Sequence, residues 1–158
     1  MKFKVQKLTE EQAKEVSTWK YEGEYKIYNL PKWNDMVKDN YSLCDELKRE
    51  RFTAYINEKN ELIGFTNLLD EGNSVFFGIG INPKYCNKGI GKKITKLSLD
   101  ECKVKFPNKP VILEVRTWNT RAINCYKSQG FEVIETKHQE TCIGLGEFYV
   151  MKHLNIMN

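Results

Sequence analysis

The sequence predicts a single α+β domain, over residues 1–158, in which helices flank a central mixed, mostly antiparallel sheet. Two observations predict this class. Two apolar segments joined by a short polar turn, within residues 52–69, indicate an antiparallel hairpin. Further on, an apolar strand at 74–82, a helix at 89–105 and an apolar strand at 111–115 form a crossover, the connection that joins parallel strands.

The N-terminal residues predict a short edge strand followed by a capped helix. Residues 2–6 alternate apolar and polar side chains, as a half-buried strand does. Thr9 then caps a helix, and Gln12 three residues later gives the spacing of a capping box. Residues 19–41 lack a clear period although aromatic residues are dense, and Pro31 favours a new helix start. These aromatic side chains either pack in the core or line a binding pocket.

The middle of the chain predicts three consecutive strands. Residues 52–56 and 62–69 form the hairpin. A second turn at 70–73 leads into the strand at 74–82, which Pro83 ends.

The helix predicted at 89–105 is amphipathic. Ile90, Ile94, Leu97 and Val104 fall on one face at helical spacing, so we expect that face to be buried.

The C-terminal third predicts a strand, a helix and two final strands. The strand at 111–115 is nearly all apolar, which is typical of strands buried on both faces. An amphipathic helix at 119–129 is closed by Gly130. The final strands are expected at 131–136 and 146–151.

Composition excludes several classes of protein. The net charge is only +4 and both signs are mixed along the chain, so composition does not predict a nucleic-acid partner. Five scattered cysteines without a Cys-x-x-Cys pair predict thiols in a reducing compartment, and two distant histidines give no zinc spacing, so no metal is expected. Without a signal-peptide pattern or an apolar run of about 20 residues, we expect a cytoplasmic protein with no membrane partner.

The most informative segment is residues 74–94, SVFFGIGINPKYCNKGIGKKI. Gly78 and Gly80 interrupt its apolar strand. Glycine weakens a strand, so it often marks a bulge or a place where another group approaches the backbone closely.

The same segment ends in a glycine-rich helix start. Gly89 and Gly91 stand where backbone N–H groups have no helical partner, and Lys88, Lys92 and Lys93 add positive charge. The glycines let a phosphate approach the backbone without a side-chain clash. The spacing matches neither a P-loop nor a dinucleotide fingerprint. We interpret this helix start as a cradle for a pyrophosphate.

A second segment, residues 113–131, adds a motif with its own characteristic spacing. Residues 113–131 predict strand, loop, helix and strand, and five of them fit the spacing Asn-x-x-Ala-x-x-x-Tyr-x-x-x-Gly-Phe. They are Asn119, Ala122, Tyr126, Gly130 and Phe131. Together with the glycines after a strand ending in x-Pro, this pattern resembles the GNAT N-acetyltransferase superfamily. The resemblance implies the GNAT acyl-CoA N-acyltransferase fold and transfer of acetyl from acetyl-CoA directly to a primary amine.

The resemblance also implies roles for individual residues. Main-chain groups of the strand would meet the pantetheine arm, the loop N–H groups would hold the pyrophosphate, and Asn119 would bond the pantetheine or the helix start. Tyr126 would stand near the thioester sulfur. The implied acetyl-CoA-binding residues are Ile79, Gly80, Ile81, Asn87, Lys88, Gly89, Ile90, Gly91, Lys92, Asn119 and Tyr126.

Two positions depart from the family pattern. Cys86 stands where the family usually has Gln or Arg, and Asn87 stands where Gly is frequent. The first departure removes a side chain that commonly helps to bind the phosphates.

Catalysis of amine acetylation calls for a base and an acid. The attacking amine must be neutral, and the leaving CoA thiolate benefits from a proton donor. Tyr126 is the candidate acid, and Glu114, a charged residue in an apolar strand, is the candidate base. The run from Leu113 to Arg116, with Tyr126 twelve residues after the glutamate, resembles bacterial ribosomal-protein-alanine N-acetyltransferases, in which the corresponding residues are base and acid. An ion pair at Glu114, an ordered water as the base, and a core position for Tyr126 remain open.

The acceptor is not legible from the sequence. A protein N-terminus and a small-molecule amine both fit the chemistry. A non-catalytic CoA-binding module is the alternative from another class, which Cys86 favours and Tyr126 opposes. RNA binding has little support because no aromatic and basic motif is present. Members of the resembled family are often dimers, so the resemblance admits a homodimer.

Overall fold

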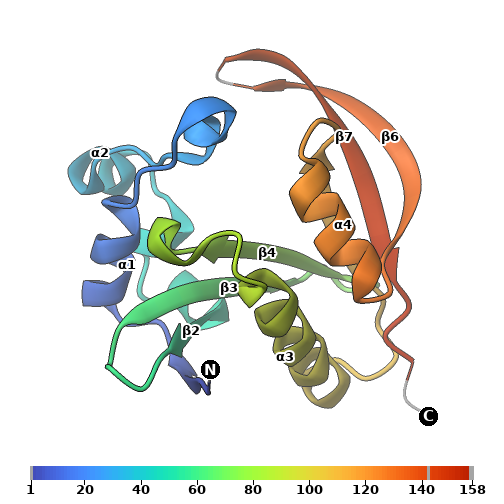
Figure 1. Ribbon diagram of the computed structural model, residues 1–158, viewed down its shortest axis with the longest axis horizontal. Coiled ribbons are helices and arrows are strands. Elements are labelled where there is room, and N and C mark those ends of the chain that lie inside the picture. Colours follow the sequence, from blue (N-terminus) through green and yellow to red (C-terminus); the bar gives the residue numbers. More distant parts are fainter. Residues whose placement is uncertain (1, 142, 157–158) are drawn as a thin grey trace. The chain divides into compact units, whose positions relative to one another are not determined.

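A computed structural model describes residues 2–141 and 143–156 of the chain. Within this described part the strands form a seven-stranded sheet with the order β1-β2-β3-β4-β5-β7-β6 (Figure 1). Strands β4 and β5 pair in parallel, whereas β1–β2, β2–β3, β5–β7 and β6–β7 pair antiparallel. The predicted mixed, mostly antiparallel sheet with flanking helices is therefore confirmed.

The bounds of the elements follow the predicted order along the chain. The strands are β1 (Lys4–Lys7), β2 (Phe52–Ile56), β3 (Leu62–Asp70), β4 (Val75–Ile81), β5 (Val111–Arg116), β6 (Glu132–Thr141) and β7 (Gly144–His153). The α-helices are α1 (Glu10–Ser17), α2 (Trp33–Lys38), α3 (Ile90–Lys105) and α4 (Thr120–Ser128). Short 3₁₀ helices lie at Gly23–Tyr28, Ser42–Cys44, Lys48–Arg51 and Pro83–Tyr85.

The chain divides into two compact units. The N-terminal unit contains the chain up to Asn67 together with Ile79–Lys88, and the C-terminal unit contains Leu68–Gly78 together with the chain from Gly89 onward. Each unit is described by itself below. The prediction of one domain remains a prediction.

The N-terminal unit begins as the sequence predicts. Helix α1 carries the full capping box, because Thr9 Oγ1 accepts from the Gln12 N–H at 3.1 Å and Gln12 Oε1 accepts from the Thr9 N–H at 3.0 Å. This exchange satisfies two N–H groups that a helix start otherwise leaves without partners. Strand β1 then pairs with β2, and β2 pairs with β3.

The aromatic residues between positions 19 and 41 serve two different ends. Trp19 is buried in the core cluster of α1, β2 and β3, and Trp33 packs against the same cluster. Tyr25 and Tyr28 instead stack on each other with ring centroids 6.5 Å apart, and the Tyr28 side chain is exposed. The two tryptophans therefore belong to the core.

Two burial predictions in the C-terminal unit are wrong. In β5 the burial alternates, so Val111, Leu113 and Val115 are buried while the residues between them are only partly covered. On α3, Val104 is 80% exposed, and the buried face instead includes Thr95 and Ser98 together with its apolar members. The buried face of α3 therefore includes small polar side chains, so the spacing of its large apolar residues did not predict that face.

The last two strands are longer than predicted. Strands β6 and β7, of ten residues each, form a hairpin that is visible as the long pair of orange and red ribbons in Figure 1. Helix α4 ends as expected, because Gly130 adopts a left-handed φ of +96° and its N–H donates to the Lys127 carbonyl. After β7, the fully buried side chain of Asn155 donates to the carbonyls of Cys102, Phe106 and Lys109. It ties the chain to the connection between α3 and β5.

No helix in the described ranges is long and apolar enough to cross a membrane.

Candidate active site

The start of α3, in the C-terminal unit, has the features of an anion site. Its N-cap residue is Gly89, in the left-handed conformation at φ +75°, and no side chain caps the helix. The first turn holds no acidic residue, whereas Lys92 and Lys93 lie within it and are exposed. Because the first N–H groups of a helix lack intrahelical partners and carry its positive dipole end, this terminus favours a negatively charged group.

The next two longest helices in the described ranges, α1 and α4, close their N-termini with side chains. The capping box closes α1, and Asn119 Oδ1 accepts from the Ala122 N–H at 3.2 Å to close α4. The resemblance implied one of two roles for Asn119, a hydrogen bond to the helix start or one to pantetheine. The buried side chain makes the first of these, at the start of α4. Its other assigned role, toward the pantetheine, stays a prediction.

Gly91 and Cys125 bring the start of α3 against α4. A Cβ atom placed on Gly91 would lie 3.5 Å from Cys125 Sγ, which is an ordinary contact. Burial raises the pKa of the Cys125 thiol, against the opposing charge of Lys92. Cys125 thus lies at the contact between α4 and the start of α3.

Tyr126, the next residue of α4, is half-buried among aromatic rings. Its ring meets Phe77 edge-on at 6.4 Å and Phe131 at 5.9 Å between centroids. Phe131 in turn lies 5.4 Å from the His153 ring. The ring of Tyr126 is therefore held by packing, and this fixes where its hydroxyl points.

Glu114 on β5 is engaged by two residues of β6. Its Oε2 accepts from Lys137 Nζ at 3.0 Å, and its Oε1 accepts from Gln139 Nε2 at 3.3 Å. The Glu114 side chain is 22% exposed, so the carboxylate keeps some access to solvent. The ion pair that the sequence left open is present.

In the N-terminal unit, Gly80 of β4 has a packing reason. A Cβ atom on this residue would lie 2.4 Å from Cε1 of Phe65, so the aromatic ring occupies the space that a side chain would need. At the end of the same strand, the Tyr21 hydroxyl donates to the Ile81 carbonyl at 2.7 Å. The roles of Ile79, Gly80 and Ile81 toward pantetheine remain predictions.

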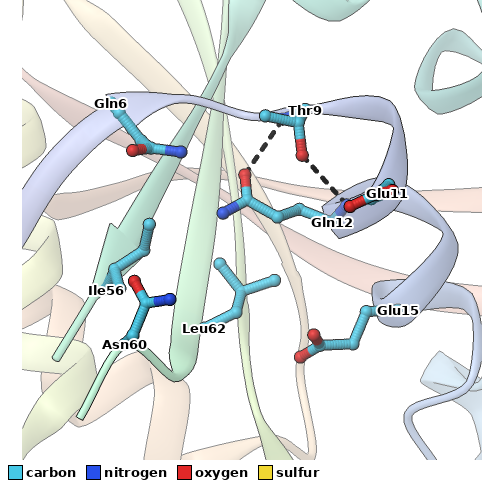
Figure 2. A pocket seen from close by; sticks show the side chains of 8 residues that line it. All are labelled: Gln6, Thr9, Glu11, Gln12, Glu15, Ile56, Asn60 and Leu62. Carbon is cyan, nitrogen blue, oxygen red and sulfur yellow. Dashed lines mark hydrogen bonds between the residues drawn. The ribbon is translucent and has the colours of Figure 1, made fainter.

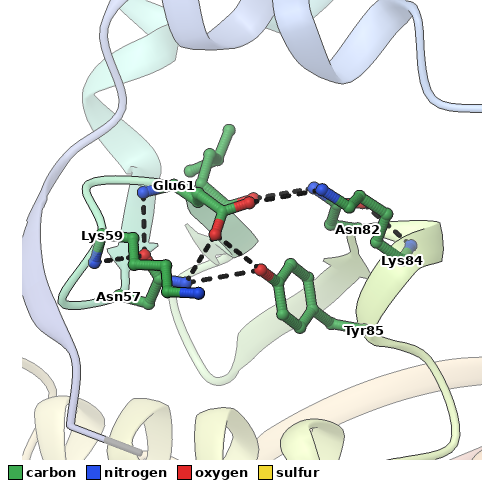
Figure 3. A network of polar contacts seen from close by, with 7 residues as sticks. Asn57, Lys59, Glu61, Asn82, Lys84 and Tyr85 are labelled. Carbon is green, nitrogen blue, oxygen red and sulfur yellow. Dashed lines mark hydrogen bonds and ion pairs between the residues drawn. The ribbon is translucent and has the colours of Figure 1, made fainter.

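The loop after β4 contains a residue, Tyr85, that the sequence pattern did not single out. Tyr85 donates its hydroxyl to Glu61 Oε1 at 2.8 Å, and the Lys88 ammonium lies 5.7 Å from the centre of the Tyr85 ring (Figure 3 shows the network around Tyr85). Asn87, between them, has a left-handed φ of +64°. The Cys86 thiol lies 3.8 Å from the carbonyl oxygen of Asn82, the residue that follows β4. Tyr85 and Glu61 are 24 positions apart in the chain, so no local sequence pattern predicts the hydrogen bond between them.

An open pocket of about 350 Å³ lies in the N-terminal unit beside α1 (Figure 2). It is mostly polar, and it is lined by Gln6, Thr9, Glu11, Gln12, Glu15, Ile56, Asn60 and Leu62. None of the residues predicted to bind acetyl-CoA lines it, and Thr9 and Gln12 already serve the capping box.

The described residues contain no group of three or more acidic, histidine or cysteine side chains that could hold a metal ion. Among them, Cys44, Cys86, Cys102 and Cys125 form no disulfide, and Cys142 lies outside the described residues. Burial raises the pKa of Cys102 to about 12.

Comparison with known proteins decides the family. The family model described as the acetyltransferase (GNAT) family matches residues 11–131, more than half of the chain. The chain belongs to the GNAT acetyltransferase family. This result confirms the resemblance drawn from the glycine motif and the asparagine motif.

One curated relative of this GNAT protein is the mycothiol acetyltransferase of Mycolicibacterium smegmatis, which is 30% identical over 86 residues. The match covers 52% of this chain and 29% of that protein. The chain thus matches less than a third of the length of that relative.

Solved structures show the same fold. A GNAT-family acetyltransferase from Bacillus anthracis has a TM-score of 0.81 at 14% identity, with 98% of this chain and 96% of that chain covered. The ribosomal-protein-S18-alanine N-acetyltransferase of Escherichia coli has a TM-score of 0.71 at 17% identity, covering 99% and 96%. A spermidine N-acetyltransferase of Vibrio cholerae, solved with CoA and spermine, has a TM-score of 0.71 at 18% identity, covering 98% and 96%. At these identities the likeness concerns the fold.

Proposed function

We propose that this protein transfers an acetyl group from acetyl-CoA directly to a primary amine, either a protein N-terminus or a small-molecule amine. The uncapped start of α3 is the observation that carries the proposal, because it suits the pyrophosphate of CoA. Gly89, Ile90, Gly91 and Lys92 would supply backbone N–H groups and one cation to it.

The proposed reaction uses residues of the C-terminal unit. The amine nitrogen attacks the thioester carbonyl, the amine loses a proton to a base, and the sulfur leaves as CoA thiol after receiving a proton. Tyr126 would donate that proton, since its packed ring fixes the position of its hydroxyl, and a phenol O–H is a hydrogen-bond donor. Glu114 would accept the amine proton, directly or through a water.

Turnover assays test the proposal. Purified protein is mixed with acetyl-CoA and a panel of N-terminal peptides, lysine peptides, polyamines and amino sugars, and the release of CoA thiol is followed. Release with one acceptor class would establish the transferase and name its substrate class. Stabilisation of the protein by CoA without release from any acceptor would support a non-catalytic CoA-binding module.

The variant Tyr126→Phe tests the acid. It keeps the ring contacts with Phe77 and Phe131, so the fold should be retained, while loss of the proton donor should lower kcat by about 10²- to 10⁴-fold. The exposed Tyr41 provides the matched control, since Tyr41→Phe removes a hydroxyl far along the chain from the proposed acid. Equal kcat values in Tyr126→Phe and wild type would exclude the acid role.

A pair of variants separates the two readings of Glu114. If its carboxylate is the base, Glu114→Gln should lower kcat by about 10²-fold or more, whereas Lys137→Gln, which removes only the ion-pair partner, should retain most of it. If the residue serves only the ion pair, both variants should lose the same small stability, at most about 1 kcal/mol, with kcat unchanged. Steady-state kinetics and urea unfolding of both variants give the answer.

A further inference from the structure

Tyr85 makes contacts through its hydroxyl and through the face of its ring, and it has no role in the proposed acetyl transfer itself. Its hydroxyl donates to Glu61 Oε1 at 2.8 Å, and its ring lies beneath the Lys88 ammonium at 5.7 Å from the centroid. A cation within about 6 Å of an aromatic centroid is attracted by the negative face of the ring. The ring therefore restrains a lysine that is otherwise exposed.

The partner of Tyr85 is itself rigidly placed. Glu61 sits at the end of the β2–β3 turn, where Asn57 Oδ1 accepts from the N–H groups of Lys59 and Glu61 at 3.0 and 2.9 Å (Figure 3). Asn57 Nδ2 also lies 3.3 Å from Glu61 Oε1. The hydrogen bond from Tyr85, with a second from Asn57, holds the pKa of Glu61 below its usual value. The Glu61 carboxylate thus accepts the hydrogen bond from a fixed place, and this bond holds the Tyr85 ring in position.

The segment that carries Tyr85 is fixed from the other side by Asn82. Its N–H donates to the Ile63 carbonyl at 2.8 Å and its Nδ2 donates to the Leu62 carbonyl at 3.0 Å, while its Oδ1 accepts from the Lys84 N–H at 3.0 Å. These contacts, drawn in part in Figure 3, join the loop to β3 immediately before Tyr85. The hairpin turn and the loop therefore form one connected network.

This network restrains the side chain of Lys88 through the Tyr85 ring. A lysine side chain has four rotatable bonds, and its conformational freedom must be lost when it binds an anion. A ring that restrains the ammonium beforehand removes part of this cost, which is the general effect of preorganisation. The nearby Cys86 cannot supply a cation, and its thiol lies against the Asn82 carbonyl.

We propose that Tyr85 is a positioning residue, which holds the Lys88 ammonium for a phosphate group of CoA, and that Glu61 and Asn57 fix Tyr85 for this task. The inference rests on the proposed function, because it concerns the phosphates of acetyl-CoA. It assigns to Lys88 the cationic contact that the family usually obtains at the position of Cys86. Tyr85 acts through Lys88 and has no contact of its own with the reacting atoms.

A double-mutant cycle on CoA affinity tests this inference. Lys88→Ala should weaken CoA binding by about tenfold or more, and Tyr85→Leu by about two- to fivefold. The double variant should bind no more weakly than Lys88→Ala alone, because the effect of Tyr85 passes through the lysine. Lys59→Ala, which removes another lysine charge from the same unit and keeps the backbone bond to Asn57, should leave the affinity unchanged.

Kinetics give a readout that a merely structural role would not move. In Tyr85→Leu, KM for acetyl-CoA should rise with kcat retained, and KM for acetyl-pantetheine, which lacks the phosphates, should stay the same. If Tyr85→Leu does not fold, Tyr85→Phe carries the same cycle, since it keeps the ring and removes the bond to Glu61. In that variant the loss should be about twofold and should again vanish in the Lys88→Ala background.

The outcomes separate this inference from the function on which it rests. Wild-type protein that neither binds CoA nor releases it from acetyl-CoA would refute the proposed function. Wild-type protein that binds CoA, with losses from Tyr85 and Lys88 variants that multiply, would refute the inference alone. An equal rise in KM for acetyl-CoA and acetyl-pantetheine would also overturn it, because the effect would then not depend on phosphate.

Discussion

Replacement of Gly80 by alanine should destabilise the protein through the Phe65 ring. The added Cβ would lie 2.4 Å from Cε1 and 2.7 Å from Cζ of Phe65, so the ring must move by about 1 Å to restore van der Waals contact. The ring lies 6.1 Å from the buried Trp19 and 6.0 Å from the buried Phe52, which limit that movement. Overpacking of this kind costs about 1–3 kcal/mol, which corresponds to a fall of about 1 M in the urea midpoint.

Urea unfolding of matched variants measures this cost. Gly91→Ala is the control, because its Cβ would make an ordinary 3.5 Å contact with Cys125 Sγ and alanine favours the helix by up to about 1 kcal/mol. Phe65→Leu removes the two clashing ring atoms, so the penalty of Gly80→Ala should largely disappear in that background. An unchanged midpoint for Gly80→Ala, or the same penalty with Leu at position 65, would refute the steric reasoning.

Three further predictions concern the C-terminal unit. Gly89→Ala should cost about 1–2 kcal/mol of unfolding free energy, because its φ is +75° although its surroundings are open, and Gly89→Asn should recover part of this loss in urea titrations. Asn155→Ala should lower the unfolding free energy by about 2–4 kcal/mol, since three backbone carbonyls lose their buried donor; a loss under about 1 kcal/mol would contradict that role. Burial, with a smaller contribution from the charge of Lys103, lowers the pKa of His153 below its ordinary value of 6.5. The neutral imidazole is therefore the form that the folded state favours. Its contribution to stability is complete above pH 6.5 and is lost as the pH falls from 6.5 towards the pKa of the folded state. The urea midpoint should therefore fall between pH 7.5 and 5.5, and His153→Gln should flatten this dependence.

Local signals in the sequence predicted local structure well. The capping box at Thr9 and Gln12 forms as its spacing indicates, because both partners lie within one helical turn. Gly130 ends α4 in the left-handed conformation that favours glycine. The motif glycines at the start of α3 lie where a helix start was expected. In each case the interacting groups are within a few residues of one another.

Burial patterns were harder to predict because they depend on what packs against an element. Val104 has the right spacing for the buried face of α3 but is exposed, whereas Thr95 and Ser98 are fully buried. Nothing in the helix itself distinguishes these outcomes, since small polar side chains fit a closely packed face that a larger apolar residue would overfill. In β5, similarly, the apolar residues up to Leu113 predicted burial on both faces, but one face remains only partly covered.

The glycines of β4 illustrate the same limit for the site. The sequence left open a bulge or the close approach of another group at Gly80, and the Phe65 ring lies against this residue. A fall in CoA affinity in Gly80→Ala would therefore not by itself identify a ligand contact. Stability must be measured beside it, because a shifted ring and a blocked ligand give the same loss of binding.

Glu114 shows how non-local structure changes the chemical argument. The sequence marked it as a charge in an apolar strand, and its partners come from β6, which extends to Thr141 and so carries Lys137 and Gln139 to it. Each carboxylate oxygen has two lone pairs, so one hydrogen bond on each still leaves acceptor capacity for a proton or a water. The ion pair is therefore compatible with the proposed role of Glu114 as a base, and it holds the carboxylate in one orientation. For this reason the comparison of Glu114→Gln with Lys137→Gln is informative, because only the first variant removes the proton acceptor while both remove the pair.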